Sequence, residues 1–114
     1  MDDMVFAQLA RYFRALSEPI RLKILDALRT GPASVGQLTS ALGCSQANVS
    51  KHLAVLMETG LVAREARGTS AYYRFAEPDV YQLCDLVCGQ VAKRLEGGAQ
   101  LRSLLTAMAA RHTP

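Results

Sequence analysis

Two short helical segments joined at Gly43-Cys44 constrain this chain more than any of its other features. The segment from Ser34 to Thr59 reads SVGQLTSALGCSQANVSKHLAVLMET. Apolar residues recur at helical spacing on both sides of the glycine, a residue type that commonly ends a helix. Ser34 and Gln37 form a capping box for the first helix, and Ser45 can cap the second. A helix pair with a Gly-containing turn can insert its second helix into the major groove of DNA.

Two further helices are predicted before this pair. Residues 5–16 and 19–28 each carry an apolar stripe at helical spacing, and Gly31-Pro32 ends the second stripe. Ser17 is the expected N-cap of the second helix, with Pro19 tolerated in its first turn.

After the helix pair the spacing of the apolar residues changes from helical to alternating, which predicts a β-hairpin. More helix is predicted after the hairpin. Residues 61–67 and 71–76 read as short strands, and Gly68-Thr69-Ser70 between them reads as a turn. A long helix is expected from residue 78 to about residue 94. An apolar stripe over residues 101–108 predicts a last helix.

The predicted fold is therefore mainly α with a small β-hairpin, a dimeric winged helix-turn-helix in which residues 1–114 form a single domain. Residues 34–59 are the helix-turn-helix, and residues 61–76 are the wing. The helices expected within 1–16 and 78–112 carry more apolar surface than a monomer of this size needs. We expect these two regions to form a dimer interface.

The charge balance suits a partner with phosphates without requiring one. The 114 residues include 20% charged residues, and the net charge is +3. No run of apolar residues is long enough to predict a membrane span, and the acidic N-terminus does not read as a signal peptide. The odd count of three cysteines provides no disulfide framework. These features predict a cytoplasmic protein without a membrane partner.

The candidate DNA contacts lie on the outward face of the helix that begins after Ser45 and on the hairpin. The inward stripe of that helix consists of Val49, Leu53 and Leu56. On the opposite face Gln46 can read an adenine edge and Ser50 can serve several bases. Lys51 and Ser45 suit phosphates, and hairpin arginines suit the backbone or the minor groove. Taken alone, this face is also what a solvated helix presents; the hairpin behind it favours DNA. The predicted contacts are Ser45, Gln46, Asn48, Ser50, Lys51, His52, Arg67 and Arg74.

Several short motifs occur together in this chain: LSEPIRLKIL at 16–25, QL at 37–38, SQANVSKHL at 45–53, Leu56, GLV at 60–62, RG at 67–68 and YYR at 72–74. With these motifs the chain resembles the ArsR/SmtB family of bacterial winged-helix repressors over roughly residues 5–95. The resemblance implies a homodimer that binds a double-stranded DNA operator with dyad symmetry. It also implies an inducer, commonly a metal ion, arsenite or an oxidant, that lowers the affinity for DNA.

His52 has more than one interpretation on the semi-buried side of its helix. It either donates to a phosphate, relays a change to the second helix, or simply packs. Because the family often has a histidine here, the resemblance favours a DNA role. A metal role is not expected, since no ligand partner lies nearby in the sequence.

Two sensor patterns known in the family are missing from this sequence. One is a Cys-x-Cys pair in the third helix, where residues 34–38 contain no cysteine. The other begins with Asp-x-His on the fifth helix, but here Asp79 is followed by Val80 and Tyr81. A zinc sensor of the usual kind is therefore not expected.

Cys84 and Cys88 are the remaining candidates for a sensor. At helical spacing their β-carbons lie about 5–6 Å apart, whereas a disulfide needs about 3.5–4.5 Å. Bridging by one soft atom, As(III) or a soft metal ion, suits this spacing better, with a third ligand from Cys44 or the other subunit. The pair could instead sense oxidants or reactive sulfur, or pack as small apolar residues in a dimer interface. Cys44 is also explained as a small residue in a turn.

The expected function is a homodimeric, sequence-specific DNA-binding repressor, derepressed by a thiol-reactive inducer at Cys84 and Cys88. No cofactor is required. The alternatives are a redox or reactive-sulfur-responsive repressor, a repressor with no cysteine sensor, and a winged-helix module that binds protein or RNA. An enzyme is not expected, because the sequence shows no phosphate-binding glycine loop, metal cluster or nucleophile–base pair.

Overall fold

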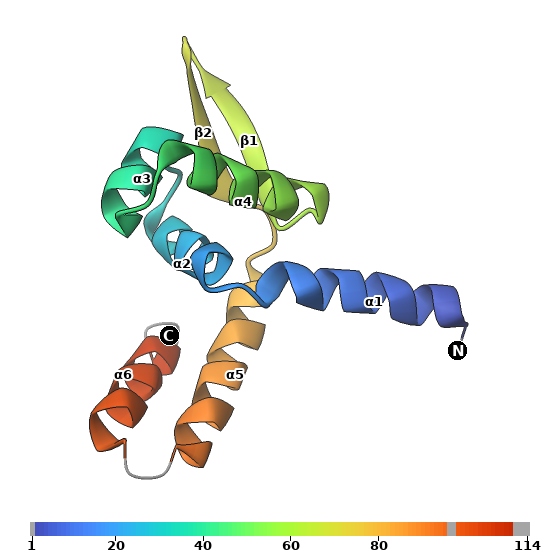
Figure 1. The fold of residues 1–114 in the computed structure, drawn as a ribbon, viewed down its shortest axis with the longest axis vertical. Coiled ribbons are helices and arrows are strands. Elements are labelled where there is room, and N and C mark those ends of the chain that lie inside the picture. The colour runs from blue at the N-terminus through green and yellow to red at the C-terminus, as the bar shows by residue number, and fades with distance from the viewer. Residues whose placement is uncertain (1, 96–97, 111–114) are drawn as a thin grey trace. The chain divides into compact units, whose positions relative to one another are not determined.

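The computed structural model describes residues 2–95 and 98–110, which form two compact units divided after Glu77. The first unit contains the helices and strands up to the end of the hairpin, and the second contains two helices (Figure 1). The elements of the first unit are α1 (Asp3–Leu16), α2 (Pro19–Ala27), the 3-10 turn η1 (Leu28–Thr30), α3 (Val35–Leu42), α4 (Gln46–Glu58), β1 (Val62–Arg67) and β2 (Ser70–Phe75). Those of the second are α5 (Asp79–Arg94) and α6 (Ala99–Ala110).

Buried aliphatic side chains from α2, α3, α4 and the start of the hairpin form the core of the first unit. The predicted inward stripe of α4 is confirmed, because its members are almost completely buried. Burial of a stripe on one side of α4 leaves its other side outward. The core residues of this unit are Ala15, Ile24, Leu25, Leu28, Leu38, Val49, Leu53, Leu56, Leu61 and Val62.

Local capping determines where α3 and α4 begin and end. The capping box is present, with the Gln37 N–H donating to Ser34 Oγ at 3.2 Å and the Ser34 N–H donating to Gln37 Oε1 at 2.9 Å. Gly43 ends α3 in the left-handed region at φ 68°, which a glycine adopts without steric penalty. Ser45 then caps α4 by accepting from the Asn48 N–H at 3.1 Å. The predicted caps of the helix pair are confirmed.

The predicted N-cap of α2 is wrong. Glu18, not Ser17, is the N-cap, and its carboxylate accepts from the Arg21 N–H at 3.0 Å. Ser17 instead lies at the C-terminal end of α1, where its Oγ donates to the Arg14 carbonyl at 3.0 Å. The reason is positional: Pro19 occupies the first turn, so the cap falls on the residue directly before it.

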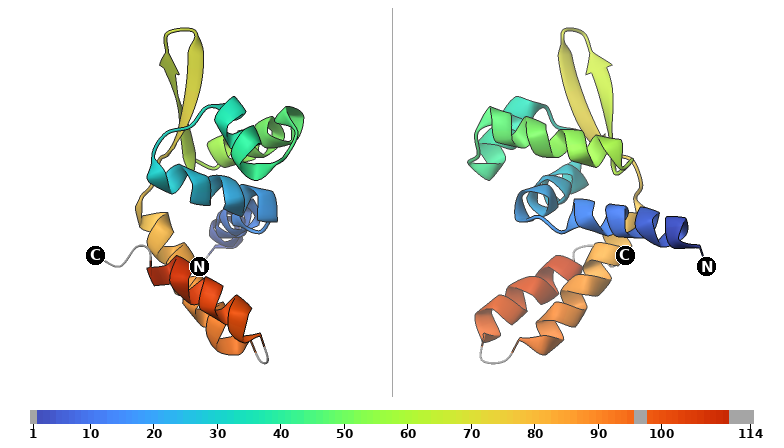
Figure 2. Two further views of the ribbon diagram at one scale, coloured as in Figure 1. Left: turned by 90° about the vertical axis from the view of Figure 1, so that its left-hand side faces the viewer. Right: turned by 45° about the vertical axis from the view of Figure 1, so that its right-hand side comes forward.

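The hairpin extends beyond α3 and α4 in each view, as a wing (Figures 1 and 2). Its antiparallel register pairs Val62 with Phe75 and Arg67 with Ser70. β1 therefore begins one residue later than predicted, β2 is shifted by one residue toward the N-terminus at both ends, and the turn is Gly68-Thr69 alone. Gly68 has φ 63°, at the position where a type II′ turn requires glycine. Tyr73 also exchanges backbone hydrogen bonds of 2.8 and 2.9 Å with Ala33, which ties the wing to the segment before α3.

In the second unit α5 and α6 lie side by side and antiparallel (Figure 1). Val80 and Ala92 of α5 are buried, and the Arg102 guanidinium donates to the Leu95 carbonyl at the end of α5. The predicted long helix is thus observed at almost the expected bounds. Met1, Gly97 and residues 111–112 of the predicted helical regions lie outside the described residues. Within residues 2–95 and 98–110, no helix combines the length and apolar character that a bilayer crossing needs.

Candidate nucleic-acid interface

The N-terminal half of α4 presents polar side chains outward. Ser45, Gln46, Ser50 and Lys51 are exposed, and Asn48 is half-buried. The Ser45 hydroxyl accepts from the Asn48 N–H, so its own O–H remains able to donate to a phosphate. Exposed hydrogen-bonding groups and one cation therefore lie along the N-terminal part of α4, beside and beyond the buried stripe.

The wing holds one of its two predicted arginines in a defined position. Arg67 Nη2 lies 2.6 Å from Glu65 Oε1, and the guanidinium carbon lies 4.6 Å from the centre of the Tyr72 ring. Glu65 pairs with Tyr72, and Ala63 pairs with Arg74, so these side chains share one face of the hairpin. Arg74 is exposed on that face. Sequence reasoning missed Glu65 and Tyr72, although Glu65 is two residues from Arg67 and hence on the same side of the strand.

His52 faces the interior of the first unit instead of the outward row. It is 6% exposed, and its Nδ1 lies 3.2 Å from Arg21 Nη1. Its Nε2 lies 3.8 Å from Glu18 Oε2. This burial argues against a direct contact of His52 with DNA and favours the alternative interpretation, a link to the second helix.

Arg21 joins three helices and was missed by the sequence analysis. Its Nε donates to the Ala15 carbonyl at 2.7 Å, and its Nη2 donates to the Arg14 carbonyl at 2.9 Å. Both acceptors belong to the last turn of α1, while His52 belongs to α4. The available signal was a cation in the first turn of α2, placed directly after the C-terminal end of α1.

Glu18 carries a shifted pKa because of this cluster. Burial raises the pKa of its carboxyl. The pKa is nevertheless lowered, because four other interactions together outweigh burial: the hydrogen bond from the Arg21 N–H, the charge that His52 carries when protonated, the hydrogen bond from the Ile20 N–H and the charge of Arg21. The ionised carboxylate therefore stabilises the folded chain.

Replacing Glu18 by glutamine is expected to flatten the acid limb of the stability profile. Because the folded pKa lies below the unfolded one, this contribution is present above about pH 5 and is lost as the pH falls through the folded pKa. Urea unfolding at pH 7 and pH 3 should show a smaller loss of stability for Glu18→Gln than for the wild type. Equal losses in the two proteins would contradict this assignment.

The candidate sensor cysteines lie one helical turn apart on α5. Cys84 and Cys88 are half-buried, and all three cysteines of the described structure are thiols. Cys44 is half-buried at the turn between α3 and α4, with its Sγ 3.8 Å from the Leu42 carbonyl. Among the described residues, no three His, Cys, Asp or Glu side chains come together as a metal site.

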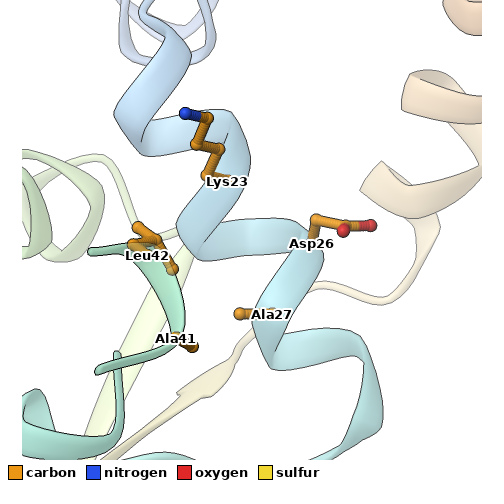
Figure 3. Close-up of a pocket in the computed structure, with 5 residues that line it drawn as sticks. All are labelled: Lys23, Asp26, Ala27, Ala41 and Leu42. Atoms are coloured by element: carbon orange, nitrogen blue, oxygen red, sulfur yellow. The ribbon is translucent and has the colours of Figure 1, made fainter. Parts of the chain in front are cut away.

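A shallow pocket of about 300 Å³ lies between α2 and the end of α3 (Figure 3). Ala41 and Leu42 form one side, and Lys23 and Ala27 form the other. The Asp26 carboxylate is directed away from the α3 side (Figure 3). The predicted DNA and metal residues are not among those that line this pocket.

Several known proteins are similar in sequence to this chain, both within the helix-turn-helix and outside it. A family model described as "Bacterial regulatory protein, arsR family" matches residues 18–64. The HTH-type transcriptional regulator NmtR of Mycobacterium tuberculosis (strain ATCC 25618 / H37Rv) is 41% identical over 85 residues, which cover 75% of this chain and 71% of NmtR. A probable mercury resistance operon repressor of Streptomyces lividans is 36% identical over 74 residues, which cover 65% of this chain and 59% of that repressor.

A solved structure from Mycobacterium bovis supports the fold. It is the homodimeric winged helix-turn-helix DNA-binding domain of Mb0332, with a TM-score of 0.70 and 37% identity, and the match covers 81% of this chain and 83% of that one. The predicted winged helix-turn-helix is confirmed, and so is the prediction that the chain is not an enzyme, because the matched family consists of transcriptional regulators. The chain belongs to the arsR family of bacterial transcriptional regulators, whose winged helices bind DNA.

Proposed function

We propose that this chain is a homodimeric repressor that reads an operator of dyad symmetry with α4 and is released from it by a thiol-reactive inducer. The observation that carries the proposal is the outward row of exposed Gln46, Ser50 and Lys51 on a helix whose apolar stripe is almost fully buried. A rigidly anchored helix with such a row has the properties needed to enter a major groove. Arg67 and Arg74 on the wing supply cations for the adjacent backbone or minor groove.

Unpartnered apolar faces support a second copy of the chain as partner. On α1, Phe6 is 54% exposed, and on α5, Leu86 is 70% exposed. Met4, Leu9, Phe13, Val87 and Val91 add to these faces. So much exposed apolar surface is unusual for a monomer, and the Mycobacterium bovis relative is described as homodimeric. A twofold dimer would present its two α4 helices about 34 Å apart, one turn of DNA.

Two thiols at one-turn spacing support Cys84 and Cys88 as the inducer site. Thiolates are the ligands that soft ions prefer, which suits As(III) or a soft metal ion. The matched Streptomyces protein is described as a probable mercury resistance operon repressor. A third donor would come from Cys44, the second subunit or the inducer itself.

Selection of DNA by the protein tests this function. Duplexes bound by the wild-type protein would be enriched from a random library, and the enriched sequence used in mobility-shift titrations at several salt concentrations. We expect a palindromic sequence, a steep salt dependence, and a dimer in sedimentation equilibrium. If no sequence is enriched, the repressor assignment fails and the protein-interaction alternative replaces it.

Replacing Cys84 and Cys88 together by serine is expected to preserve DNA binding and abolish induction. Coupling between an inducer site and DNA binding typically changes affinity about 5- to 150-fold. Mobility shifts with arsenite, mercury(II), cadmium, peroxide and polysulfide would measure that change in the wild type, with thiol mass spectrometry on each sample. Cys44→Ser is the matched control and should retain the response unless Cys44 is the third ligand. A double variant that still responds to the wild type's inducer would show that these cysteines are not the sensor.

A further inference from the structure

We propose that Arg21 is a positioning residue that fixes the recognition helix α4 relative to α1 through His52. The inference rests on the proposed function, in which α4 reads DNA and α1 contributes to the dimer. Arg21 itself contacts neither DNA nor a second copy in this assignment. Its role is to hold two elements of one subunit in register.

The guanidinium of Arg21 has the chemistry for this task. It presents several N–H donors in a planar fork and has no acceptor. Nε and Nη2 donate to the last-turn carbonyls of Ala15 and Arg14, and the Arg14 carbonyl also accepts from the Ser17 N–H and Oγ. The positive charge also lies at the negative end of the α1 dipole. One side of the fork is thereby attached to the end of α1.

The other side of the fork reaches α4 through a defined histidine tautomer. Because a guanidinium only donates, His52 Nδ1 at 3.2 Å from Arg21 Nη1 has to be the acceptor. The ring hydrogen then lies on Nε2, which faces the Glu18 carboxylate. Glu18 also caps α2 by accepting from the Arg21 N–H. His52 is therefore hydrogen-bonded to Arg21 on one edge and lies near the Glu18 carboxylate on the other.

A second link between α1 and α4 is much weaker. Arg11 Nη2 lies 3.7 Å from Glu58 Oε1, but these side chains are well exposed. Exposed ion pairs of this kind contribute little to the free energy of folding. Breaking a hydrogen bond to a buried ring costs more, because the buried polar group is left without a partner. Of these two polar links, the one through Arg21 and His52 is consequently the one expected to fix the position of α4 relative to α1.

Loss of this positioning should reduce sequence selection before it reduces general DNA binding. Specific binding needs both α4 helices of a dimer in register with their half-sites. Non-specific binding depends mainly on the cations near the phosphates, and these do not change in number when Arg21 becomes lysine. The two kinds of binding therefore separate a positioning role from a phosphate contact.

Arg21→Lys tests the inference with the full-length chain. The probes are the duplex enriched by the wild type and an unrelated duplex of equal length. We expect about tenfold weaker binding of the enriched duplex, unchanged binding of the unrelated duplex, and an unchanged dimer. Arg14→Lys is the matched control, because the hydrogen bonds of Arg14 in this cluster use its backbone carbonyl, which the substitution leaves in place. The inference is wrong if Arg21→Lys binds the enriched duplex as tightly as the wild type does. It is also wrong if the substitution weakens binding of the two duplexes equally.

A pair of His52 variants gives an independent readout if Arg21→Lys folds poorly. In His52→Asn the side-chain oxygen replaces Nδ1 as acceptor, so selective binding should be retained; in His52→Phe it should fall to the level of Arg21→Lys. Nitrogen NMR of the wild type should show the ring hydrogen on Nε2. Equal binding by the two variants, or a hydrogen on Nδ1, would overturn the inference. A wild type that enriches no duplex would instead overturn the proposed function.

Discussion

Ser50→Glu is expected to weaken binding of the enriched duplex about a hundredfold, a change of about 2.7 kcal/mol. Ser50 is exposed on the outward row of α4, so the new carboxylate would face the acceptor-rich groove and its phosphates. Like charges brought together in an interface cost several kcal/mol. Glutamate is also a better helix former than serine, so the fold should persist. Mobility-shift titration measures the loss, and circular dichroism checks the helix content.

Ser103→Glu is the matched control for this experiment. Ser103 is exposed on α6, outside the proposed DNA contacts of α4 and the wing, and its substitution lowers the net charge by the same unit, from +3 to +2. Long-range repulsion between DNA and the added negative charge would affect both variants alike. If Ser50→Glu binds the enriched duplex as tightly as Ser103→Glu does, the outward row of α4 does not contact DNA.

Leu53→Ala is expected to destabilise the chain by about 2–5 kcal/mol. Leu53 is 1% exposed and lies in the middle of the buried stripe of α4. Truncating it removes apolar contacts and leaves a cavity that the surrounding helices cannot fill completely. For a small domain with a stability of about 5–15 kcal/mol, this is a large fraction of the total. Urea unfolding followed by circular dichroism measures the change.

Leu22→Ala makes the same chemical change at a site that is 44% exposed on α2. Its expected loss is clearly smaller, because much of that side chain is already in contact with water. Similar losses at both positions would mean that the α4 stripe is not packed as the structure describes.

Local signals made much of the site predictable. Ser34, Gln37, Gly43 and Ser45 act on backbone groups within a few residues of themselves, so their spacing was enough to locate α3 and α4. The buried stripe of α4 followed from helical periodicity in the same way. The cap of α2 was misassigned because Ser17 and Glu18 are adjacent and either side chain can accept a hydrogen bond.

The amino-acid order alone determined the helix pair, the hairpin after it and the outward polar row of α4, because each depends on interactions between near neighbours in the chain. Only the tertiary structure decided which way the His52 ring faces and what it contacts. Its partner Arg21 is 31 residues away in the chain. Packing of α4 against α2 turns the His52 ring inward, and the residues on either side of it do not reveal which direction it will take. The Arg21 contacts to α1 likewise exist only because two helix ends meet in space.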